Sequence, residues 1–428
     1  MRVLLLLTLT TGAAAAQTAG DSLSLRDVTS AAVNADPRQR QIGLNASASD
    51  LRIQNILASR LPQFTGNGQA QYQSAVTKIS VPIPGIAIPS PTRDTYDAHV
   101  NAEESIFDPT LSSKQSLERA QLAETQAGVR TSVFSRRQEV NDVFFAAATL
   151  EQRIAEIGVA ITGLESRLKE AVTRFRGGAA LPGDTAVVAA TLLQRRQDLY
   201  QARSDRAAAL ARMSDLIGRP ISASTFTVIP NLDAAVAHAL GGLDQLKSRP
   251  EYEQFSATRD RLTKQEALDA AQDKPKVSAF GRVGYGRPGL NMLSSSFQTY
   301  WLAGVQVQWS PWNWNTTDRD RQSLEIQREI VSTNETSFTE SLRRGIQQSI
   351  ATIAGLDSSL VLDDQIVALR ERIEGETRAK LNEGVVTAAE YTDRSTDVLN
   401  ARLMRIQHRV QRTQAQANLL TTLGVEVP

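Results

Sequence analysis

Two long stretches of this chain contain no proline, one between Pro109 and Pro182 and the other between Pro311 and Pro428. Proline breaks the interior of a helix, so its absence over such lengths permits very long helices. At 1.5 Å per residue, the first stretch alone would extend for about 100 Å as one helix. Apolar residues in both stretches recur at alternating spacings of three and four, which predicts helices packed as in a coiled coil. The predicted seam residues are Ile154, Ile157, Ile161, Leu164, Leu168, Val172 and Phe175, then Val188, Leu192, Leu199, Ala202, Ala209, Met213 and Leu216, and finally Leu399, Leu403, Ile406, Val410, Ala417 and Leu420.

The N-terminal segment MRVLLLLTLTTGAAAAQ has a basic residue, a short apolar run and four consecutive alanines. This pattern predicts a signal peptide over residues 1–16 and therefore an exported protein that begins near Gln17. The sequence contains no cysteine, which argues against a lipid anchor, disulfides and thiolate chemistry. No later segment approaches the roughly 18 consecutive apolar residues of a spanning helix, so entry into a membrane would require strands.

Landmarks repeat along the chain with a nearly constant offset. Pro37 and Pro62 recur as Pro250 and Pro275, an offset of 213 residues, whereas later landmarks are separated by 206 residues. A proline-rich loop at 76–94, longer than its counterpart at 287–298, accounts for the difference. The later landmark pairs are Gly178 with Gly384, Asp184 with Glu390, and Gly218 with Gly424.

We therefore predict an internal duplication, with a first repeat over 17–230 and a second over 231–428. Each repeat is expected to contain a helix, a β-hairpin and a long helical hairpin. The β-hairpins are predicted at about 63–107 and 276–311, and the helical hairpins at about 109–217 and 315–423.

The segment TYWLAGVQVQWS (299–310) alternates between an apolar face and a mostly polar face, as a membrane strand does. Segments 96–106 and 277–285 show the same alternation. Two hairpins supply only four strands, too few to close a barrel, and open strand edges cannot lie in lipid. If the strands enter a membrane, several chains must therefore build the barrel together. The predicted aromatic girdle comprises Trp301, Trp309, Trp312, Tyr96 and Tyr285.

The duplicated plan behind a signal peptide resembles the TolC family of outer-membrane efflux proteins, also called outer membrane factors, over essentially the whole mature chain. In that family each helical-hairpin tip reads approximately basic–aromatic–x–x–Gly, followed six residues later by an acid. The corresponding residues here are Arg174, Phe175, Gly178 and Asp184 in the first tip, and Lys380, Leu381, Gly384 and Glu390 in the second. The strand-to-helix junctions Ile106-Phe107-Asp108 and Ser310-Pro311-Trp312-Asn313 also look like those of the family.

The resemblance implies an α+β membrane protein in which long coiled-coil hairpins form an α-barrel. Four transmembrane strands per protomer would complete the twelve-stranded barrel of a homotrimer in the outer membrane, with the α-barrel extending into the periplasm. Residues near 17–25 and 219–247 would form a belt around the tunnel. The implied function is a passive conduit for efflux of small molecules, working with a periplasmic membrane-fusion adaptor and an inner-membrane transporter.

The resemblance also implies roles for the tip residues. Arg174, Phe175, Gly178, Lys380 and Gly384 would dock the adaptor. Glu390 and Asp393, which lie three residues apart on one helical face, would form acidic rings at the pore aperture, together with Asp184. The family often has tyrosine and arginine where this chain has Leu381 and Val386, so its closing network is not transferred here.

The same sequence argues against several other functions. The net charge of +1 argues against a nucleic-acid partner, and the three histidines show no ligand spacing. The glycine-rich GRVGYGRPG (281–289) lacks the spacing of a dinucleotide site, and no catalytic motif is present, so we predict no enzyme activity, cofactor or metal. Two alternatives stay open: an exit duct for type I protein secretion, and a soluble exported coiled-coil scaffold or adaptor.

Overall fold

The computed structural model describes residues 22–76, 91–178, 181–241, 247–292 and 294–428. The predicted signal peptide (1–16) and most of the predicted proline-rich loop (76–94) lie outside these residues. The chain divides into two compact units. The helical unit comprises Met1–Gln39, Thr131–Arg249 and Phe338–Pro428, and the sheet unit comprises Arg40–Arg130 and Pro250–Ser337. Each unit therefore takes segments from both predicted repeats.

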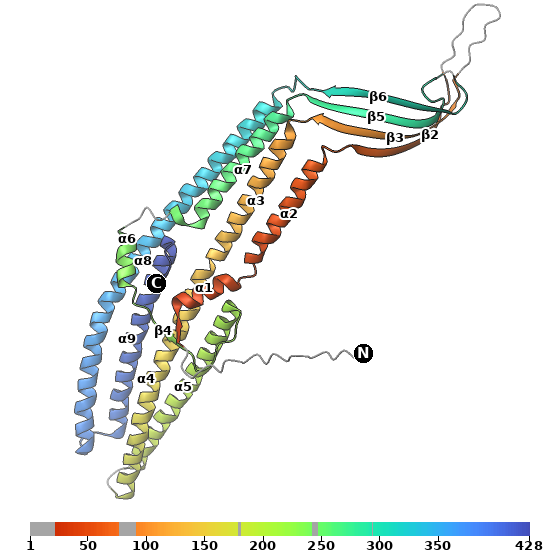
Figure 1. The fold of residues 1–428 in the computed structure, drawn as a ribbon. Coiled ribbons are helices and arrows are strands. Elements are labelled where there is room, and N and C mark those ends of the chain that lie inside the picture. The colour runs from red at the N-terminus through yellow and green to blue at the C-terminus, as the bar shows by residue number, and fades with distance from the viewer. Residues whose placement is uncertain (1–21, 77–90, 179–180, 242–246, 293) are drawn as a thin grey trace, which may run out of the picture. The chain divides into compact units, whose positions relative to one another are not determined.

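The sheet unit is built around four antiparallel strands in the order β2-β3-β5-β6 (Figure 1). These strands are β2 (Gln63–Tyr72), β3 (Asp94–Phe107), β5 (Lys276–Arg287) and β6 (Gln298–Gln308). Strand β3 of the first predicted hairpin pairs with β5 of the second, which leaves β2 and β6 at the edges of the sheet. The helices attached to this sheet are α2 (Gln39–Ala58), most of α3 (Thr110–Phe134), α7 (Pro250–Gln272) and the beginning of α8 (Thr316–Asn382).

One face of this sheet is apolar and exposed. The strand register aligns Val100 on β3 with Val283 on β5 and Trp301 on β6. All three side chains are exposed, Trp301 to 74%. The alternation predicted for the segments at 96–106, 277–285 and 299–310 is confirmed, except that β6 already ends at Gln308, so Trp309 follows the strand instead of belonging to it.

The opposite face of the sheet carries a polar network. Asp97 Oδ2 lies 2.5 Å from His99 Nδ1, and Asp97 Oδ1 accepts a hydrogen bond of 2.5 Å from the Tyr300 hydroxyl. Arg282 Nε donates to Asn101 Oδ1 at 2.6 Å. The sheet therefore separates an apolar face from a hydrogen-bonded polar face, as the two faces of a membrane strand require.

The helical unit consists of long hairpins and a small parallel strand pair. Its helices are α1 (Leu25–Ala35), α4 (Arg136–Arg176), α5 (Pro182–Ile217), α6 (Asp233–Leu240), α9 (Ala388–Leu423) and the remainder of α8. The pair joins β1 (Ser22–Ser24) to β4 (Phe226–Val228). Among the described residues, no helix carries an apolar run long enough to cross a membrane.

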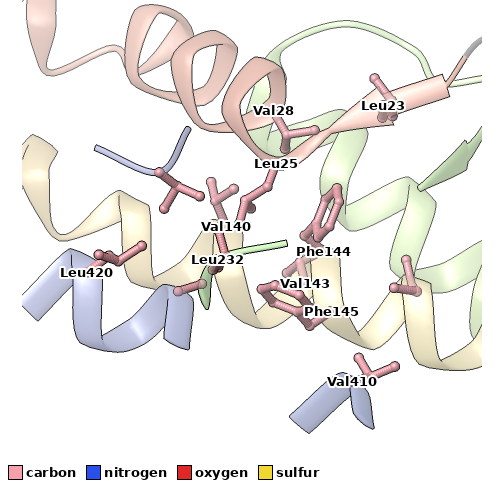
Figure 2. Packing of buried hydrophobic residues seen from close by; sticks show 14 of the residues in the cluster. Leu23, Leu25, Val28, Val140, Val143, Phe144, Phe145, Leu232, Val410 and Leu420 are labelled. Carbon is pink, nitrogen blue, oxygen red and sulfur yellow. The ribbon is translucent and has the colours of Figure 1, made fainter. Parts of the chain in front are cut away.

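The core of the helical unit lies where α1, α4 and α9 meet (Figure 2). Phe144 and Phe145 are fully buried and pack edge to face, with ring centroids 5.4 Å apart. Full burial of such side chains stabilises the fold by roughly 1.5–3 kcal/mol each. A second cluster toward the tips contains the predicted seam residues Ile157, Ile161, Leu164, Val188 and Leu192.

Helices α8 and α9 are joined by polar contacts along their length. Arg402 pairs with Glu371 at 2.6 Å, and Arg405 pairs with Asp364 at 3.2 Å. The outward side of α8 carries exposed apolar residues at spacings of four, three and four. These residues are Leu362, Ile366, Leu369 and Ile373.

The glycines that anchor the predicted duplication share one backbone conformation. Gly178 and Gly384 have φ values of 75° and 78°, and Gly218 and Gly424 have values of 67° and 79°. Glycine populates this left-handed region without the steric cost that a Cβ atom incurs. The matched conformations support the proposal that the chain is internally duplicated.

Candidate functional site: the helical-hairpin tips

The first tip connects α4 to α5. Helix α4 ends at Arg176, and Gly177 and Gly178 follow, the latter in the left-handed conformation described above. Helix α5 begins at Pro182, where the fixed φ of proline suits a first helical turn. Asp184 then accepts a hydrogen bond of 3.1 Å on Oδ2 from the Leu181 backbone N–H, which stabilises the start of α5.

The second tip connects α8 to α9 through a similar glycine-containing turn. The N–H of Gly384 donates to Leu381 O at 3.1 Å, and the N–H of Val385 donates to Lys380 O at 2.9 Å. This pattern satisfies the last carbonyls of α8 and needs a left-handed residue, which Gly384 supplies. Helix α9 then starts after Thr387, whose hydroxyl accepts a hydrogen bond of 3.3 Å from the N–H of Glu390.

The two tips are bound to each other. Arg174 donates from Nη1 to Leu381 O at 3.0 Å and from Nη2 to Asn382 O at 2.8 Å. The cation therefore lies on the C-terminal carbonyls of α8, where a positive charge is favoured. On the other side, Asp184 Oδ1 accepts a longer hydrogen bond of 3.4 Å from the Ala388 N–H.

A cleft of about 240 Å³ lies between the tips. Arg167, Arg174 and Asp184 line it from the first hairpin, and Val386 and Tyr391 from the second. The Tyr391 side chain is 7% exposed, and the Arg167 guanidinium carbon lies 5.2 Å from the centre of its ring. Burial raises the pKa of the Tyr391 hydroxyl, and a hydrogen bond to Glu374 raises it further. The phenol therefore stays neutral at physiological pH.

Glu390 and Asp393 lie on the exposed side of the first turns of α9. Tyr391 and Thr392, between them in sequence, are buried toward the rest of the unit. Neither Glu390 nor Asp393 forms an ion pair with any residue that the structure describes. The two carboxylates are thus presented together to the outside of the protomer, as their i, i+3 spacing predicts.

The structure gathers some predicted site residues and separates others. Arg174, Asp184 and Gly384 line the cleft, whereas Phe175 and Lys380 are exposed and lie outside its lining. The Asp184 carboxylate accepts hydrogen bonds from backbone N–H groups of both tips, which distinguishes it from the carboxylates of Glu390 and Asp393.

The predicted aromatic girdle lies in the sheet unit, at two levels. Tyr96 and Tyr285 pack against Phe297, with centroid distances of 6.0 and 5.3 Å, at the loop end of the sheet. At the helix end, Trp312 meets Trp314 edge to face at 5.8 Å. Trp301 lies on β6 between these levels.

Sequence reasoning missed several of these residues. Arg167 and Tyr391 complete the cleft, and Phe297 and Trp314 complete the aromatic groups. Tyr391 had an available signal, because it directly follows Glu390 at a tip that is otherwise free of aromatic residues. Arg167 had a signal as well, since it precedes Arg174 by two helical turns on the same face of α4.

Comparison with known proteins places this arrangement in context. Residues 244–425 match the model of the family described as outer membrane efflux protein. A search of curated proteins found no match.

Similar solved structures cover almost the whole chain. A crystal structure of CusC is 15% identical, with a TM-score of 0.68, and the alignment covers 94% of this chain and 92% of that one. The outer membrane protein VceC of Vibrio cholerae is 13% identical, with a TM-score of 0.65 and coverage of 94% and 96%. The open state of the MtrE outer membrane channel of Neisseria gonorrhoeae is 15% identical, with a TM-score of 0.63 and coverage of 94% and 89%. At these identities the similarity establishes a shared fold.

Proposed function

We propose that this chain belongs to the outer membrane efflux protein family, the TolC family, whose model matches residues 244–425, and that three copies form the outer-membrane channel of a tripartite export system. The channel is a passive conduit that carries small molecules out of the periplasm. Its partners are a periplasmic adaptor and an inner-membrane transporter.

The observation that carries this proposal is the four-stranded sheet with one exposed apolar face. Each of its edge strands, β2 and β6, has one row of backbone N–H and C=O groups that no strand of the same protomer pairs. Unpaired backbone groups are not tolerated in lipid, so the edges require partners. Because β2 and β6 run in opposite directions, β6 of one protomer can pair antiparallel with β2 of the next. Three protomers then close a twelve-stranded barrel.

The α8 stripe of Leu362, Ile366, Leu369 and Ile373 supports the same assembly. These side chains are 39–57% exposed in the protomer. Their spacing matches that of a helix-packing seam, which is stable only when a neighbouring helix covers it. In the trimer, a helix of the adjacent protomer covers this stripe and continues the wall of the α-barrel.

The tips form the periplasmic end of the channel in this proposal. The exposed residues Phe175 and Lys380, beside the rigid turns at Gly178 and Gly384, form the surface on which the adaptor docks. Arg174 and Asp184 act differently, because they hold the two tips of a protomer together.

Glu390 and Asp393 line the aperture at this end. Three copies of the pair arrange six carboxylates in two rings, which favour cations and bind divalent ions. The proposal is tested by recording currents from the purified trimer in planar bilayers. Wild type is expected to show a cation-selective conductance that divalent cations block. The Glu390→Ala/Asp393→Ala variant is expected to lose both the selectivity and the block.

A matched control removes the same charge elsewhere on a helix. Glu325 and Glu329 are exposed on α8 at comparable spacing, in the sheet unit. Glu325→Ala/Glu329→Ala is expected to retain the divalent block. If the aperture variant conducts like wild type, the channel stands and the aperture assignment is wrong. Folded wild-type protein that is released without detergent and never conducts would instead favour the soluble scaffold.

A further inference from the structure

Three of the eight lysines of this chain surround one cavity of about 240 Å³ in the sheet unit. Lys114 lies on the second turn of α3, Lys274 in the link between α7 and β5, and Lys276 at the first residue of β5. Gln308, the last residue of β6, and Trp309, which follows it, also line the cavity, as do Thr110, Gln272 and Ser310. The cavity therefore lies where the strands meet the helices, and its lining is mostly polar and cationic.

The positive charge in this cavity is only partly neutralised. The nearest carboxylate, that of Asp108, accepts hydrogen bonds from Thr110 N at 2.8 Å and Thr110 Oγ1 at 2.7 Å. Lys276 Nζ lies 3.9 Å from the same carboxylate, at the far end of the range for an ion pair. Lys114 and Lys274 form no ion pair with any described residue. Within the described part of the chain, the three lysines around the cavity therefore share one ion pair, that of Lys276 with Asp108.

The second carboxylate near the cavity, that of Asp273, forms hydrogen bonds with the turn before α8. Asp273 Oδ1 accepts hydrogen bonds from Asn313 Nδ2 at 3.0 Å and from Thr317 Oγ1 at 2.9 Å. Its backbone carbonyl accepts a hydrogen bond of 3.1 Å from the indole Nε1 of Trp309. Asp273 thus fixes the tryptophan beside the cavity while its own carboxylate is occupied by the turn before α8.

That turn presents two further tryptophans. Asn313 Oδ1 accepts a hydrogen bond of 3.1 Å from the N–H of Asn315, and both Trp314 and Asn315 adopt positive φ values of 53° and 59°. Trp312 and Trp314 are held edge to face and are 74% and 77% exposed. Exposed tryptophans beside lysines are typical of the headgroup level of a membrane, where indole rings and ammonium groups both find suitable partners.

We propose that this cavity binds the phosphate of a net-anionic phospholipid headgroup in the periplasmic leaflet of the outer membrane. The inference rests on the proposed function, since only a barrel built from this sheet brings the cavity to that level. Lys114 and Lys274 contact the phosphate, and Lys276 is shared with Asp108. Trp309, which lines the cavity, contacts the glycerol region of the lipid, which distinguishes a lipid from free phosphate.

The test uses Trp309 as the reporter, because it lines the cavity. The full-length trimer carrying Trp301→Phe, Trp312→Phe and Trp314→Phe retains this single tryptophan. It is reconstituted into phosphatidylcholine vesicles that contain either brominated phosphatidylglycerol or brominated phosphatidylcholine. Bromine quenches tryptophan fluorescence on contact, so quenching at a low mole fraction measures the relative affinity for each lipid. Phosphatidylglycerol is expected to bind about five-fold more tightly, the factor that one basic residue near a membrane surface typically contributes.

Lysine substitutions in this reporter background identify the site. Lys114→Gln/Lys274→Gln/Lys276→Gln is expected to abolish the preference, and replacing the same three lysines by arginine is expected to retain it. Lys169→Gln/Lys247→Gln/Lys264→Gln removes three lysines that lie outside the cavity lining, so it serves as the matched control and should leave the preference intact. If the triple glutamine variant does not form trimers, the single Lys114→Gln and Lys274→Gln variants provide the test, and each should lower the preference.

The outcomes separate the site from the function. A preference that survives the glutamine substitutions overturns the proposed site. Loss of the preference on adding millimolar inorganic phosphate, but not sodium chloride of equal ionic strength, assigns the cavity to free phosphate and overturns the lipid assignment. Quenching by brominated phosphatidylcholine without any preference refutes the lipid site alone. No quenching by either lipid means that the sheet does not enter the bilayer, and then the proposed function fails as well.

Discussion

The contact between the two tips depends on one side chain, and replacing Arg174 by glutamine tests it. Arg174 reaches from the last turn of α4 to two carbonyls at the end of α8, 207 and 208 residues later in the sequence. Glutamine keeps much of the apolar stem but removes the charge and the fork of donors. The substitution should therefore weaken the contact between the tips and loosen the end of α8, whose carbonyls Arg174 contacts.

The magnitude follows from the geometry. A hydrogen bond from a charged donor contributes about 1.5–3 kcal/mol. The Arg174 side chain is 34% exposed, and water can replace it on the freed carbonyls, so each bond should contribute less than this range, about 1 kcal/mol. We expect the two bonds together to contribute about 2 kcal/mol, which corresponds to an approximately 30-fold increase in the population of separated tips.

Hydrogen exchange measured by mass spectrometry on the intact trimer checks this prediction. The amides of Glu383, Gly384 and Val385 are hydrogen-bonded to the end of α8 and report its opening. Peptides covering this turn should exchange about 30-fold faster in Arg174→Gln. Arg174→Lys should be intermediate, because one ammonium group cannot reproduce the planar fork that reaches both carbonyls.

The matched control is Arg176→Gln. Arg176 lies on the same last turn of α4 and forms no hydrogen bond or ion pair within the described part of the chain. Its replacement removes the same charge and should leave exchange at the second tip unchanged. If Arg174→Gln also exchanges like wild type in an intact trimer, the two hydrogen bonds do not hold the tips together and the reasoning fails.

Three further predictions concern stability. A hydrogen bond from the Arg38 guanidinium holds the pKa of the buried Asp36 carboxyl well below its usual range. The ionised Asp36 carboxylate therefore stabilises the folded state above its unfolded pKa of about 4, and this stabilisation is lost as the pH falls toward the folded pKa. Asp36→Asn should lower the free energy of unfolding by about 2 kcal/mol at pH 7, and the denaturant midpoints of variant and wild type should converge as the pH falls below about 4. Gly384→Ala adds a methyl group into open space at a φ of 78°, so it should cost only the backbone strain, about 1 kcal/mol by thermal unfolding, and a substantially larger loss would reveal a missed contact. Gly284→Ala would place a methyl group 2.5 Å from a ring carbon of Tyr300, so it should destabilise the trimer by about 1–3 kcal/mol, measured as lower heat resistance on gels. Gly281 has open space around it, so Gly281→Ala should leave the heat resistance unchanged. Equal behaviour of the two variants would contradict the packing argument.

Features that depend on neighbours within one element were predictable from the sequence. The three–four spacing identified Ile157, Ile161 and Leu164 as buried, because the helical period places such residues on one side. The two-residue alternation likewise identified the faces of β5 and β6. Gly384 was predicted at the turn because a left-handed residue with a side chain would be strained.

The sequence was less informative about how side chains are used. The spacing rule grouped Asp184 with Glu390 and Asp393, since all three are acids near a tip. In the structure, Asp184 is bonded to backbone groups of both hairpins, whereas the other two remain exposed. Similar local sequence therefore led to different surroundings, because the rotation of each helix about its axis decides which side faces a neighbour.

The amino-acid sequence by itself determined the long helices, the alternating strands and the glycine turns, because hydrophobic periodicity and backbone preference are encoded over a few residues. Contacts between segments far apart in the chain were decided only by the tertiary structure. Arg174 reaches Leu381 across 207 residues, and Lys114 meets Lys274 and Lys276 around one cavity although α3 and β5 are remote in sequence. No local pattern carries this information, because such contacts depend on how whole helices and strands pack, and packing is the sum of many weak interactions distributed along each element.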